Sequence, residues 1–251
     1  MTVEPAPFDF PQGKEAYVRE MFSRIAGRYD LLNRLLSVRR DVAWRRRAAA
    51  LAGCGPGSRV LDVATGTGDL AFELARRVGE TGEVVGVDFV PDMLALAERK
   101  AARRAEGRRC RFLLANAMSL PFPDASFDAA TIAFGLRNLA DFAGGLSEMR
   151  RVVRPGGRVV VLELSTPVWP GLRQVYRWYF HRVVPSIGRW VQGIAGPYDY
   201  LPESVRRFPD QESLAALMVA SGLVDVEYVN LTGGIAAVHV GRVASPSKVA
   251  D

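Results

Sequence analysis

The chain has 251 residues, of which 49% are hydrophobic and 24% charged, as is typical of a folded globular protein and not of a disordered one. Two cysteines and two histidines exclude a disulfide-rich scaffold and argue against a zinc site. The net charge of +6 suggests an anionic partner, such as a membrane surface or nucleic acid, although a compositional bias toward arginine would give the same balance.

The first fifty residues are expected to be helical after a flexible tail over residues 1–13. Apolar side chains recur at helical spacing from Lys14 to Arg28, and a second helical pattern runs from Leu31 to Leu51. A glycine- and proline-rich run at residues 53–57 then breaks the pattern. We therefore expect an N-terminal helical cap over residues 14–52.

Apolar segments of strand length then alternate with helical segments. Strands are expected at Arg59–Ala64, Glu83–Asp88, Cys110–Ala115, Phe127–Phe134 and Arg158–Leu164. Helices are expected at Leu70–Val78, Pro91–Glu106 and Asp141–Arg154. This alternation is typical of right-handed βαβ units, and continuous apolar strands indicate a parallel sheet that is covered on both faces. Residues 53–166 are thus expected to form an α/β core.

The C-terminal part is expected to complete this core. Its predicted elements are a helix, Ser204–Ser221, and two strands, Val224–Leu231 and Ile235–Val243. The strands are joined by Thr232-Gly233-Gly234, a link too short for a parallel crossover, so they must form an antiparallel hairpin. Residues 203–243 therefore complete a mostly parallel sheet, and residues 244–251 are expected to be a flexible tail.

An insertion over residues 167–202 holds eight of the 23 aromatic residues, with arginines between them. Basic and aromatic residues together are typical of a membrane interface, and they also suit nucleic acid. The same aromatic side chains would equally serve as the ordinary core of a cap subdomain.

The loop after the first predicted strand reads Thr65-Gly66-Thr67-Gly68-Asp69 and leads into a helix. Glycines allow a tight turn and a close approach of ligand, and the helix N-terminus offers free N–H groups. Asp88 ends the second strand, 20 residues after Gly68, where a carboxylate can accept hydrogen bonds from both hydroxyls of a ribose. Together these features predict an adenosine-type ligand at the carboxyl edge of the sheet.

Two enzyme classes share this layout, NAD(P)-dependent oxidoreductases and S-adenosylmethionine-dependent methyltransferases. Asp62 inside the first strand favours the methyltransferases, because dinucleotide-binding strands are usually apolar there. Asn116 and Ala117 favour them too, since a polar side chain and a free N–H after the third strand can bind an adenine edge. A purely structural role, with glycines for turning and Asp88 as a helix cap, is the remaining alternative.

Further blocks make a more specific resemblance. They are Tyr29-Asp30-Leu31-Leu32-Asn33 with Trp44, Phe134-Gly135-Leu136-Arg137-Asn138, the run from Arg151 to Gly157, Glu163-Leu164-Ser165 and Thr232-Gly233-Gly234. With them the chain resembles, from about Tyr17 to Arg242, the quinone-biosynthesis C-methyltransferases, which methylate demethylmenaquinol and its ubiquinone-pathway counterpart. One departure is Asp41, where the family usually has a histidine, and it argues against a catalytic role for that side chain.

The resemblance implies a class I S-adenosylmethionine methyltransferase fold and C-methylation of demethylmenaquinol to menaquinol, or of the ubiquinone-pathway benzoquinol. The cofactor residues that it implies are Gly66, Thr67, Gly68, Asp88, Asn116 and Ala117. The substrate residues that it implies are Tyr29, Asn33, Trp44 and Phe134. Arg137 is expected to stabilise the phenolate form of the acceptor, and Asn138 to orient a water molecule or the second quinol oxygen. No metal is expected, because the sulfonium donor is already an activated electrophile.

A polyprenyl naphthoquinol or benzoquinol resides in the bilayer, so the cap and the insertion are expected to form a lid and an apolar tunnel for it. No membrane-spanning run and no signal-peptide layout occur in the sequence. We therefore expect a cytoplasmic protein, peripheral at the inner face of the membrane, without a nucleic acid partner and compatible with a homodimer. An RNA methyltransferase and a non-catalytic cofactor-binding module are the more remote alternatives.

Overall fold

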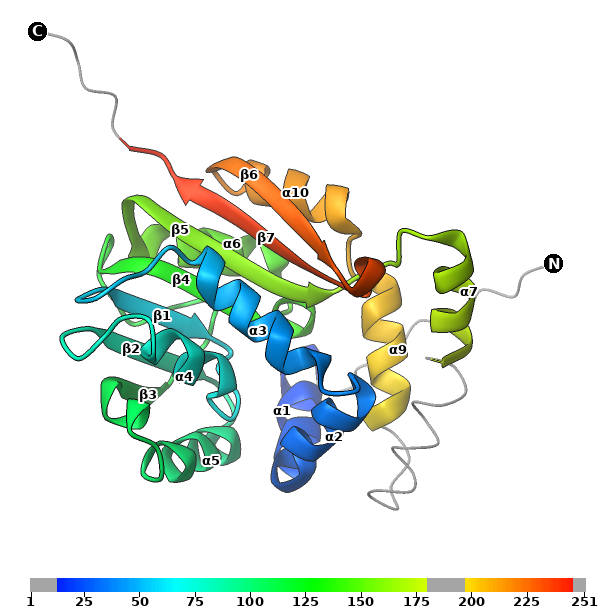
Figure 1. Ribbon diagram of the computed structural model, residues 1–251, viewed down its shortest axis with the longest axis horizontal. Coiled ribbons are helices and arrows are strands. Elements are labelled where there is room, and N and C mark those ends of the chain that lie inside the picture. Colours follow the sequence, from blue (N-terminus) through cyan, green and yellow to red (C-terminus); the bar gives the residue numbers. More distant parts are fainter. Residues whose placement is uncertain (1–12, 180–196, 246–251) are drawn as a thin grey trace, which may run out of the picture.

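A computed structural model describes residues 13–179 and 197–245, and within them a mixed β-sheet has helices on both faces (Figure 1). Its strands are β1 Arg59–Val63, β2 Glu83–Asp88, β3 Cys110–Leu114, β4 Phe127–Ala133, β5 Val153–Leu164, β6 Leu223–Leu231 and β7 Ala236–Val243. Their order is β3-β2-β1-β4-β5-β7-β6. The first five are mutually parallel, and β7 is antiparallel to both β5 and β6. The predicted mostly parallel sheet with a C-terminal hairpin is confirmed.

Helices precede, connect and follow these strands. They are α1 Lys14–Ile25, α2 Tyr29–Leu36, α3 Arg40–Leu51, α4 Asp69–Ala75, α5 Pro91–Ala101, α6 Phe142–Val152, α7 Pro170–Trp178, α9 Pro197–Arg207 and α10 Gln211–Ala220. Alternate strand residues point to opposite faces of the sheet. Val60 packs with α3 and α4 on one face, whereas Leu61 packs with α6 and α10 on the other. Both faces are therefore buried, which explains the continuous apolar strands.

The N-terminal segment differs from the prediction of one long helix over Leu31–Leu51. The chain turns between α2 and α3, where Val38 and Arg39 have φ angles of 50° and 61°. These values lie in the left-handed region, outside the helical one, so the helix ends before them. No glycine or proline marks this break in the sequence.

The C-terminal segment likewise holds two helices where one was predicted over Ser204–Ser221. Pro209 disfavours helical geometry at the residue before it, and α9 ends at Arg207. The Asp210 side chain then caps α10 by accepting a hydrogen bond of 2.9 Å from the Ser213 N–H. The predicted boundary between insertion and C-terminal part, at residues 202 and 203, falls inside α9.

The strand predicted to begin at Arg158 begins earlier. Val153 already pairs with Phe127 of β4, and the register shifts before pairing resumes at Arg158 with Ala129. The glycine- and proline-containing run between Val153 and Arg158 is thus an irregularity within β5 and not the link that leads to it. Residues 1–12, 180–196 and 246–251, which include most of the predicted tails and part of the predicted insertion, lie outside the described residues.

Helices α1 and α2 lie beside the carboxyl ends of the parallel strands, whereas α3 packs on one face of the sheet (Figure 1). Thr67 of the glycine loop donates a hydrogen bond of 2.6 Å from its hydroxyl to Asp30 of α2. Lys100 of α5 donates to Asp30 at 2.9 Å, to the Thr67 hydroxyl at 3.0 Å, and to Asp69. One ammonium therefore ties α2, the glycine loop and α5 together. In the described part of the chain, no helix is both long and apolar enough to cross a bilayer.

We predict that Lys100→Met loosens the attachment of α2 to the core. The substitution leaves Asp30 and Asp69 without their shared cation, which costs about 1–3 kcal/mol for hydrogen bonds to charged groups. Amide hydrogen exchange of α2 and the glycine loop should accelerate, while β1, β4 and β5 remain protected. Arg99→Met is the matched control, because Arg99 is an exposed neighbour on α5 that forms no ion pair within the described residues. Equal exchange in both variants would contradict this anchoring role.

Candidate active site

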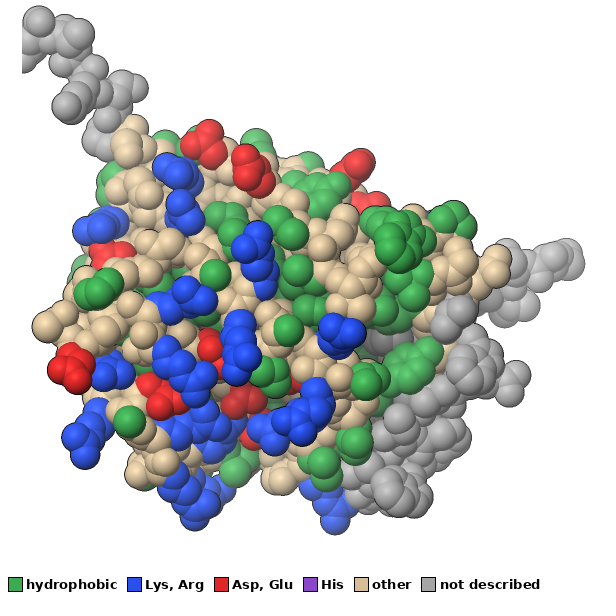
Figure 2. All heavy atoms as spheres, in the orientation of Figure 1, with side chains coloured by type: hydrophobic (Ala, Val, Ile, Leu, Met, Phe, Trp, Pro, Cys, Tyr) green, Lys and Arg blue, Asp and Glu red, His purple; other side chains and the backbone are tan. Residues whose placement is uncertain are grey.

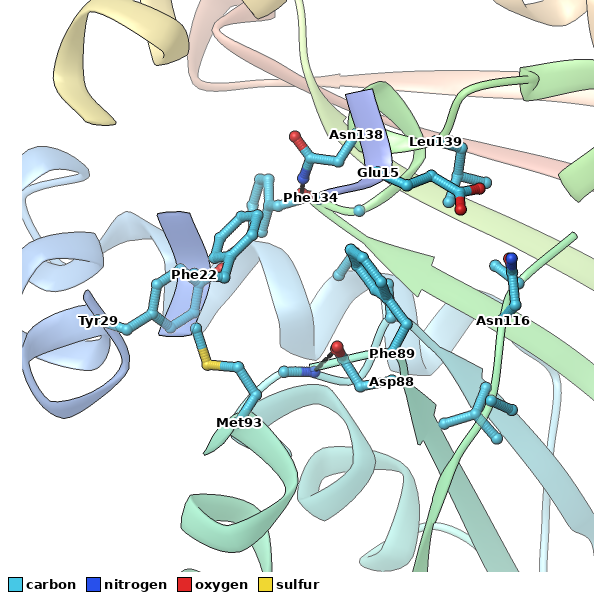
Figure 3. A pocket seen from close by; sticks show the side chains of 17 residues that line it. Glu15, Phe22, Tyr29, Asp88, Phe89, Met93, Asn116, Phe134, Asn138 and Leu139 are labelled. Atoms are coloured by element: carbon cyan, nitrogen blue, oxygen red, sulfur yellow. Dashed lines mark hydrogen bonds between the residues drawn. The ribbon is translucent and has the colours of Figure 1, made fainter. Parts of the chain in front are cut away.

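A narrow cavity of about 50 Å³ lies at the carboxyl ends of the central strands, and its wall includes Gly66, Asp88, Asn116 and Ala117 (Figure 3). The Asp88 carboxylate is fixed by the backbone, accepting hydrogen bonds from the Gly66 N–H at 2.8 Å and from the Val90 N–H at 3.0 Å. These two bonds hold the glycine loop against the end of β2. The predicted order of strand, loop and acid thus produces one compact site.

Asp88 is well placed to bind hydroxyl groups but sits in a poorly solvated position. Burial raises the pKa of its carboxyl to about 6, although backbone N–H groups that donate to it favour the charged form. Near pH 7 the group is therefore ionised and accepts hydrogen bonds only. A small change of pH below neutrality changes its charge.

Two of the predicted cofactor residues lie outside the wall of this cavity. The Thr67 side chain is buried, and its hydroxyl forms hydrogen bonds with Asp30 and Lys100. It therefore stabilises the loop on the side away from the cavity. Gly68 has a φ of 83°, and a Cβ atom there would lie 3.1 Å from the rings of Phe72 and Phe112. Both residues shape the loop, whereas Gly66 is the glycine that borders the cavity.

These residues fit an adenosine-type group. Asp88 supplies an ionised acceptor, and Phe89, Met93 and Leu139 supply apolar walls. The volume of 50 Å³ is small beside the roughly 300–1,000 Å³ typical of ligand pockets. Glu15 of α1 lines the same cavity, so α1 forms part of the wall that narrows it (Figure 3).

A larger cavity of about 490 Å³ adjoins the first and is enclosed by the N-terminal helices, α7, α9 and the strand ends. All the predicted substrate and catalytic residues line it, namely Tyr29, Asn33, Trp44, Phe134, Arg137 and Asn138. Most of its other lining side chains are apolar or aromatic. Phe22, Tyr29, Phe134 and Asn138 border both cavities, so a group could pass between them at this boundary.

Arg137 is held by a buried network centred on the end of β4. Its Nη1 donates to Glu163 Oε1 at 2.5 Å and to the Phe134 carbonyl at 2.6 Å. Glu163 Oε2 also accepts from the Arg137 backbone N–H at 3.3 Å. The Nε–H of Arg137 has no hydrogen-bond partner among the described residues. The guanidinium is thus rigidly placed while one of its donors is left unused.

Asn138 is oriented from two sides. Its Nδ2 donates to the Phe134 carbonyl at 3.2 Å, and its Oδ1 accepts from the Tyr200 hydroxyl at 3.1 Å. Burial raises the pKa of Tyr200 to about 12, so this hydroxyl stays protonated and remains a donor. Phe134, whose carbonyl serves both Arg137 and Asn138, has a φ of 57°. Such backbone strain is often found at functional sites.

Sequence reasoning missed three residues that build this site, namely Glu163, Tyr200 and Lys14. The sequence signal for Glu163 was an acidic residue within an otherwise apolar strand, which indicates a buried partner. That partner, Arg137, lies 26 residues away in the sequence. Lys14 of α1 donates from its ammonium to the Arg137 carbonyl at 3.0 Å and to the Leu139 carbonyl. That contact spans 123 residues, and no local pattern predicts it.

Asp41 and Trp44 have structural partners at the wall of the larger cavity. Buried Asp41 accepts from Arg45 Nη1 at 2.5 Å and from the Ser37 hydroxyl at 2.8 Å. The Trp44 Nε1–H donates to the Thr232 hydroxyl at 2.9 Å, and its ring centroid lies 6.2 Å from that of Phe134. Within the described ranges, no cluster of acidic, histidine or cysteine side chains is suited to hold a metal ion.

The model of the ubiE/COQ5 methyltransferase family matches residues 11–243. The chain belongs to this family. Its membership confirms the resemblance inferred from the sequence and decides for a methyltransferase over an oxidoreductase.

Curated relatives cover most of the chain and nearly all of their own length. Demethylmenaquinone methyltransferase of Thermus thermophilus is 56% identical over 221 residues, which are 88% of this chain and 99% of the relative. The protein of the same name from Deinococcus radiodurans is 52% identical over 242 residues, 96% and 99% of the two chains. Ubiquinone/menaquinone biosynthesis C-methyltransferase UbiE of a Geobacter species is 46% identical over 224 residues, 89% and 95% of the two.

Solved structures with low sequence identity share the fold. A SAM-dependent methyltransferase from Aquifex aeolicus has a TM-score of 0.60 at 19% identity, over 80% of this chain and 89% of that one. The cyclase SpnF has a TM-score of 0.68 at 18% identity, over 91% and 96% of the two chains. A cyclase on the same fold shows that the fold alone does not determine the reaction, which must be argued from the site.

We predict that affinity for S-adenosylmethionine falls as the pH falls through about 6, because hydroxyl groups donate to Asp88 only while it is ionised. Calorimetry should show about a tenfold loss for each pH unit below that value. Asp88→Asn should bind weakly and with little pH dependence.

Asp62→Asn is the matched control for this titration. Burial also raises the pKa of Asp62 to about 6, but its carboxylate accepts from the Thr65 and Thr131 hydroxyls, and it does not line either cavity. Its variant should keep the pH dependence of the wild type. Wild-type affinity in Asp88→Asn at pH 7 would rule out the assignment.

Proposed function

We propose that this protein transfers a methyl group from S-adenosylmethionine to a ring carbon of demethylmenaquinol and so forms menaquinol. One observation carries the proposal most directly, namely that the small cavity at Asp88 and the large apolar cavity meet at Tyr29, Phe134 and Asn138. The relatives that are 52–56% identical and named demethylmenaquinone methyltransferase support the choice of acceptor.

The first cavity holds the donor in this proposal. Asp88 binds the ribose hydroxyls, Gly66 lets the backbone approach, and Asn116 with Ala117 contacts the adenine. Thr67 and Gly68 keep the loop in the shape that these contacts need. When bound, S-adenosylmethionine supplies an already activated methyl group.

The second cavity holds the acceptor and prepares its ring carbon. A phenol with a pKa near 10 must lose or share its proton before the adjacent carbon becomes electron-rich. Arg137 stabilises the resulting negative charge through its unused Nε–H, since its Nη1 is already bonded to Glu163 and the Phe134 carbonyl. An arginine is a poor base, so the phenol proton leaves to water that Asn138 orients. The hydrogen that the methyl group replaces on the ring carbon then leaves as a proton while the oxygen is reprotonated, which restores the aromatic quinol with a net release of one proton. Tyr29, Asn33, Trp44 and Phe134 position the rings.

The benzoquinol of the ubiquinone pathway is the second candidate acceptor. Relatives such as the Geobacter protein carry both pathways in their name, and the larger cavity, at about 490 Å³, is lined mostly by apolar and aromatic side chains that suit either ring. A quinol of either kind with a polyprenyl tail resides in the bilayer. We therefore infer that the protein works at the cytoplasmic face of the membrane, without nucleic acid, and that a homodimer is compatible with this role.

The product of the reaction tests the proposed function. The purified protein is incubated with isotopically labelled S-adenosylmethionine and, separately, with each of the two reduced precursors. We expect mass spectrometry to find the label on the ring carbon of menaquinol. Label only in the benzoquinol would favour the second candidate, and label in neither would refute both.

We predict that Arg137→Ala lowers turnover at least about 100-fold while affinity for S-adenosylmethionine stays within a few-fold, because the lost donor acts on the acceptor. The substitution also leaves Glu163 buried without its cation, so thermal unfolding is measured alongside. Arg137→Lys keeps the charge, and should fold yet remain at least about tenfold slower, because it lacks the planar fork. Exposed Arg111→Ala is the control, and unimpaired turnover in Arg137→Ala would sink the role.

A further inference from the structure

The four leucines of α2 lie on two neighbouring faces of the helix, with Leu32 and Leu36 about 100° around the axis from Leu31 and Leu35. Leu32 is 3% exposed, and Leu36 lines the larger cavity, so the inner face is accounted for. On the outer face Leu31 is 53% exposed, Leu35 44%, and Val38 just beyond the helix 77%. Surface helices usually carry polar residues on the side away from the core. A short run of exposed large hydrophobic side chains therefore indicates an interaction surface.

The turn after α2 belongs to this surface and has a fixed backbone conformation. Val38 and Arg39 both have positive φ angles, which a β-branched residue such as valine rarely adopts. Backbone hydrogen bonds hold them there, from Arg39 N–H to the Arg34 carbonyl at 2.8 Å and from Arg40 N–H to the Ser37 carbonyl at 3.0 Å. Val38 is thus held in a strained backbone conformation in which its side chain is exposed.

Arginines surround these hydrophobic side chains. Arg34, Arg39 and Arg40 are all exposed, and none of them forms an ion pair within the described residues. Exposed arginines without an ion pair also occur elsewhere in the described residues, for example Arg99 and Arg111, so this group is distinguished by its place beside exposed hydrophobic side chains. Figure 2 shows basic side chains beside hydrophobic ones over α2 and α3. Against the opposing effect of burial, Lys100, Arg45 and Arg34 together hold the pKa of Asp69 below its ordinary value. The charges of Arg39 and Arg40 remain available to an anionic partner.

The same turn borders the larger cavity, since Ser37, Val38 and Arg40 contribute to its lining. We propose that the outer face of α2 and the following turn dock on an anionic lipid bilayer and bring the mouth of that cavity against the membrane. The docking surface comprises Leu31, Arg34, Leu35, Val38, Arg39 and Arg40. Leucine and valine side chains enter the acyl region, and the arginines bind phosphate headgroups.

This inference rests on the proposed function, because a quinol with a polyprenyl tail must be taken from the bilayer. A partner protein would also cover an apolar face. The arginines at its rim and the adjoining apolar cavity favour lipid over protein. A bilayer offers anionic headgroups to the arginines and an apolar interior beside the cavity at the same surface.

Vesicle flotation tests the docking surface. The probes are phosphatidylcholine vesicles with and without phosphatidylglycerol. We expect the wild type to bind the anionic vesicles, and both Leu31→Ser/Leu35→Ser and Arg34→Gln/Arg39→Gln to bind them at least about tenfold more weakly. The matched control is Val219→Ser/Val224→Ser, which removes exposed valines of α10 and β6, at 56% and 42% exposure, far from α2 (Figure 1).

Two methylation assays separate the docking surface from the proposed function. Leu31 and Leu35 do not line either cavity, so Leu31→Ser/Leu35→Ser should methylate a water-soluble quinol without a tail at the wild-type rate. With a polyprenyl quinol in anionic vesicles it should be at least about tenfold slower. A wild type that methylates neither quinol would refute the proposed function, whereas the vesicle-binding comparison would still decide the docking surface.

Two outcomes would overturn the docking surface itself. One is equal binding of the wild type and both α2 variants to anionic vesicles. The other is a change of oligomeric state by light scattering in the α2 variants with no change in vesicle binding, which would assign this face to a second copy of the chain.

Discussion

The buried ion pair between Arg137 and Glu163 is the interaction on which the candidate site depends. Removing two charges from water costs several kcal/mol for each ion, and the cost is offset only when further hydrogen bonds complete the pair. Here Glu163 also accepts from the backbone N–H groups of Arg137 and Leu164, and Arg137 donates to the Phe134 carbonyl. The end of β5, the turn after β4 and the positive φ of Phe134 are therefore fixed together, and with them the boundary between the two cavities.

The N-terminal helices complete this site. The parallel strands and glycine loop supply only the floor of both cavities, in a fold that solved structures show carrying other chemistry as well. Lys14 joins α1 to the Arg137 turn, and Asp30 joins α2 to the glycine loop. These two contacts tie α1 to the turn after β4 and α2 to the glycine loop, so the N-terminal helices and the walls of both cavities form one connected unit.

The sequence predicts the core well because strand-length apolar runs, glycine breaks and the acid at Asp88 are local signals. Prediction from the sequence fails where contacts between residues far apart in the chain determine the local structure. Val38 breaks a helix without glycine or proline, and β5 starts at Val153 because this residue pairs with β4 before a glycine-containing irregularity. The hydrogen bond from Thr67 to Asp30 of α2 is a further contact that no local pattern predicts. The proposed acceptor residues came only from family motifs, because the spacing of Tyr29 and Arg137 in the sequence does not by itself indicate a chemical role.

The distribution of charge links the site to its surroundings. Inside, Arg137 is offset by Glu163 and Arg45 by Asp41, so the apolar cavity carries buried charges in neutral pairs. In the proposed reaction, such a cavity suits an uncharged quinol and makes its phenolate costly except where Arg137, whose buried Nε–H has no partner among the described residues, stabilises it. Outside, Arg39 and Arg40 form no ion pair within the described residues and lie beside the exposed side chains of Leu35 and Val38. In the proposed docking, attraction to a surface thus acts at the turn after α2 and is separate from the paired charges that line the cavity.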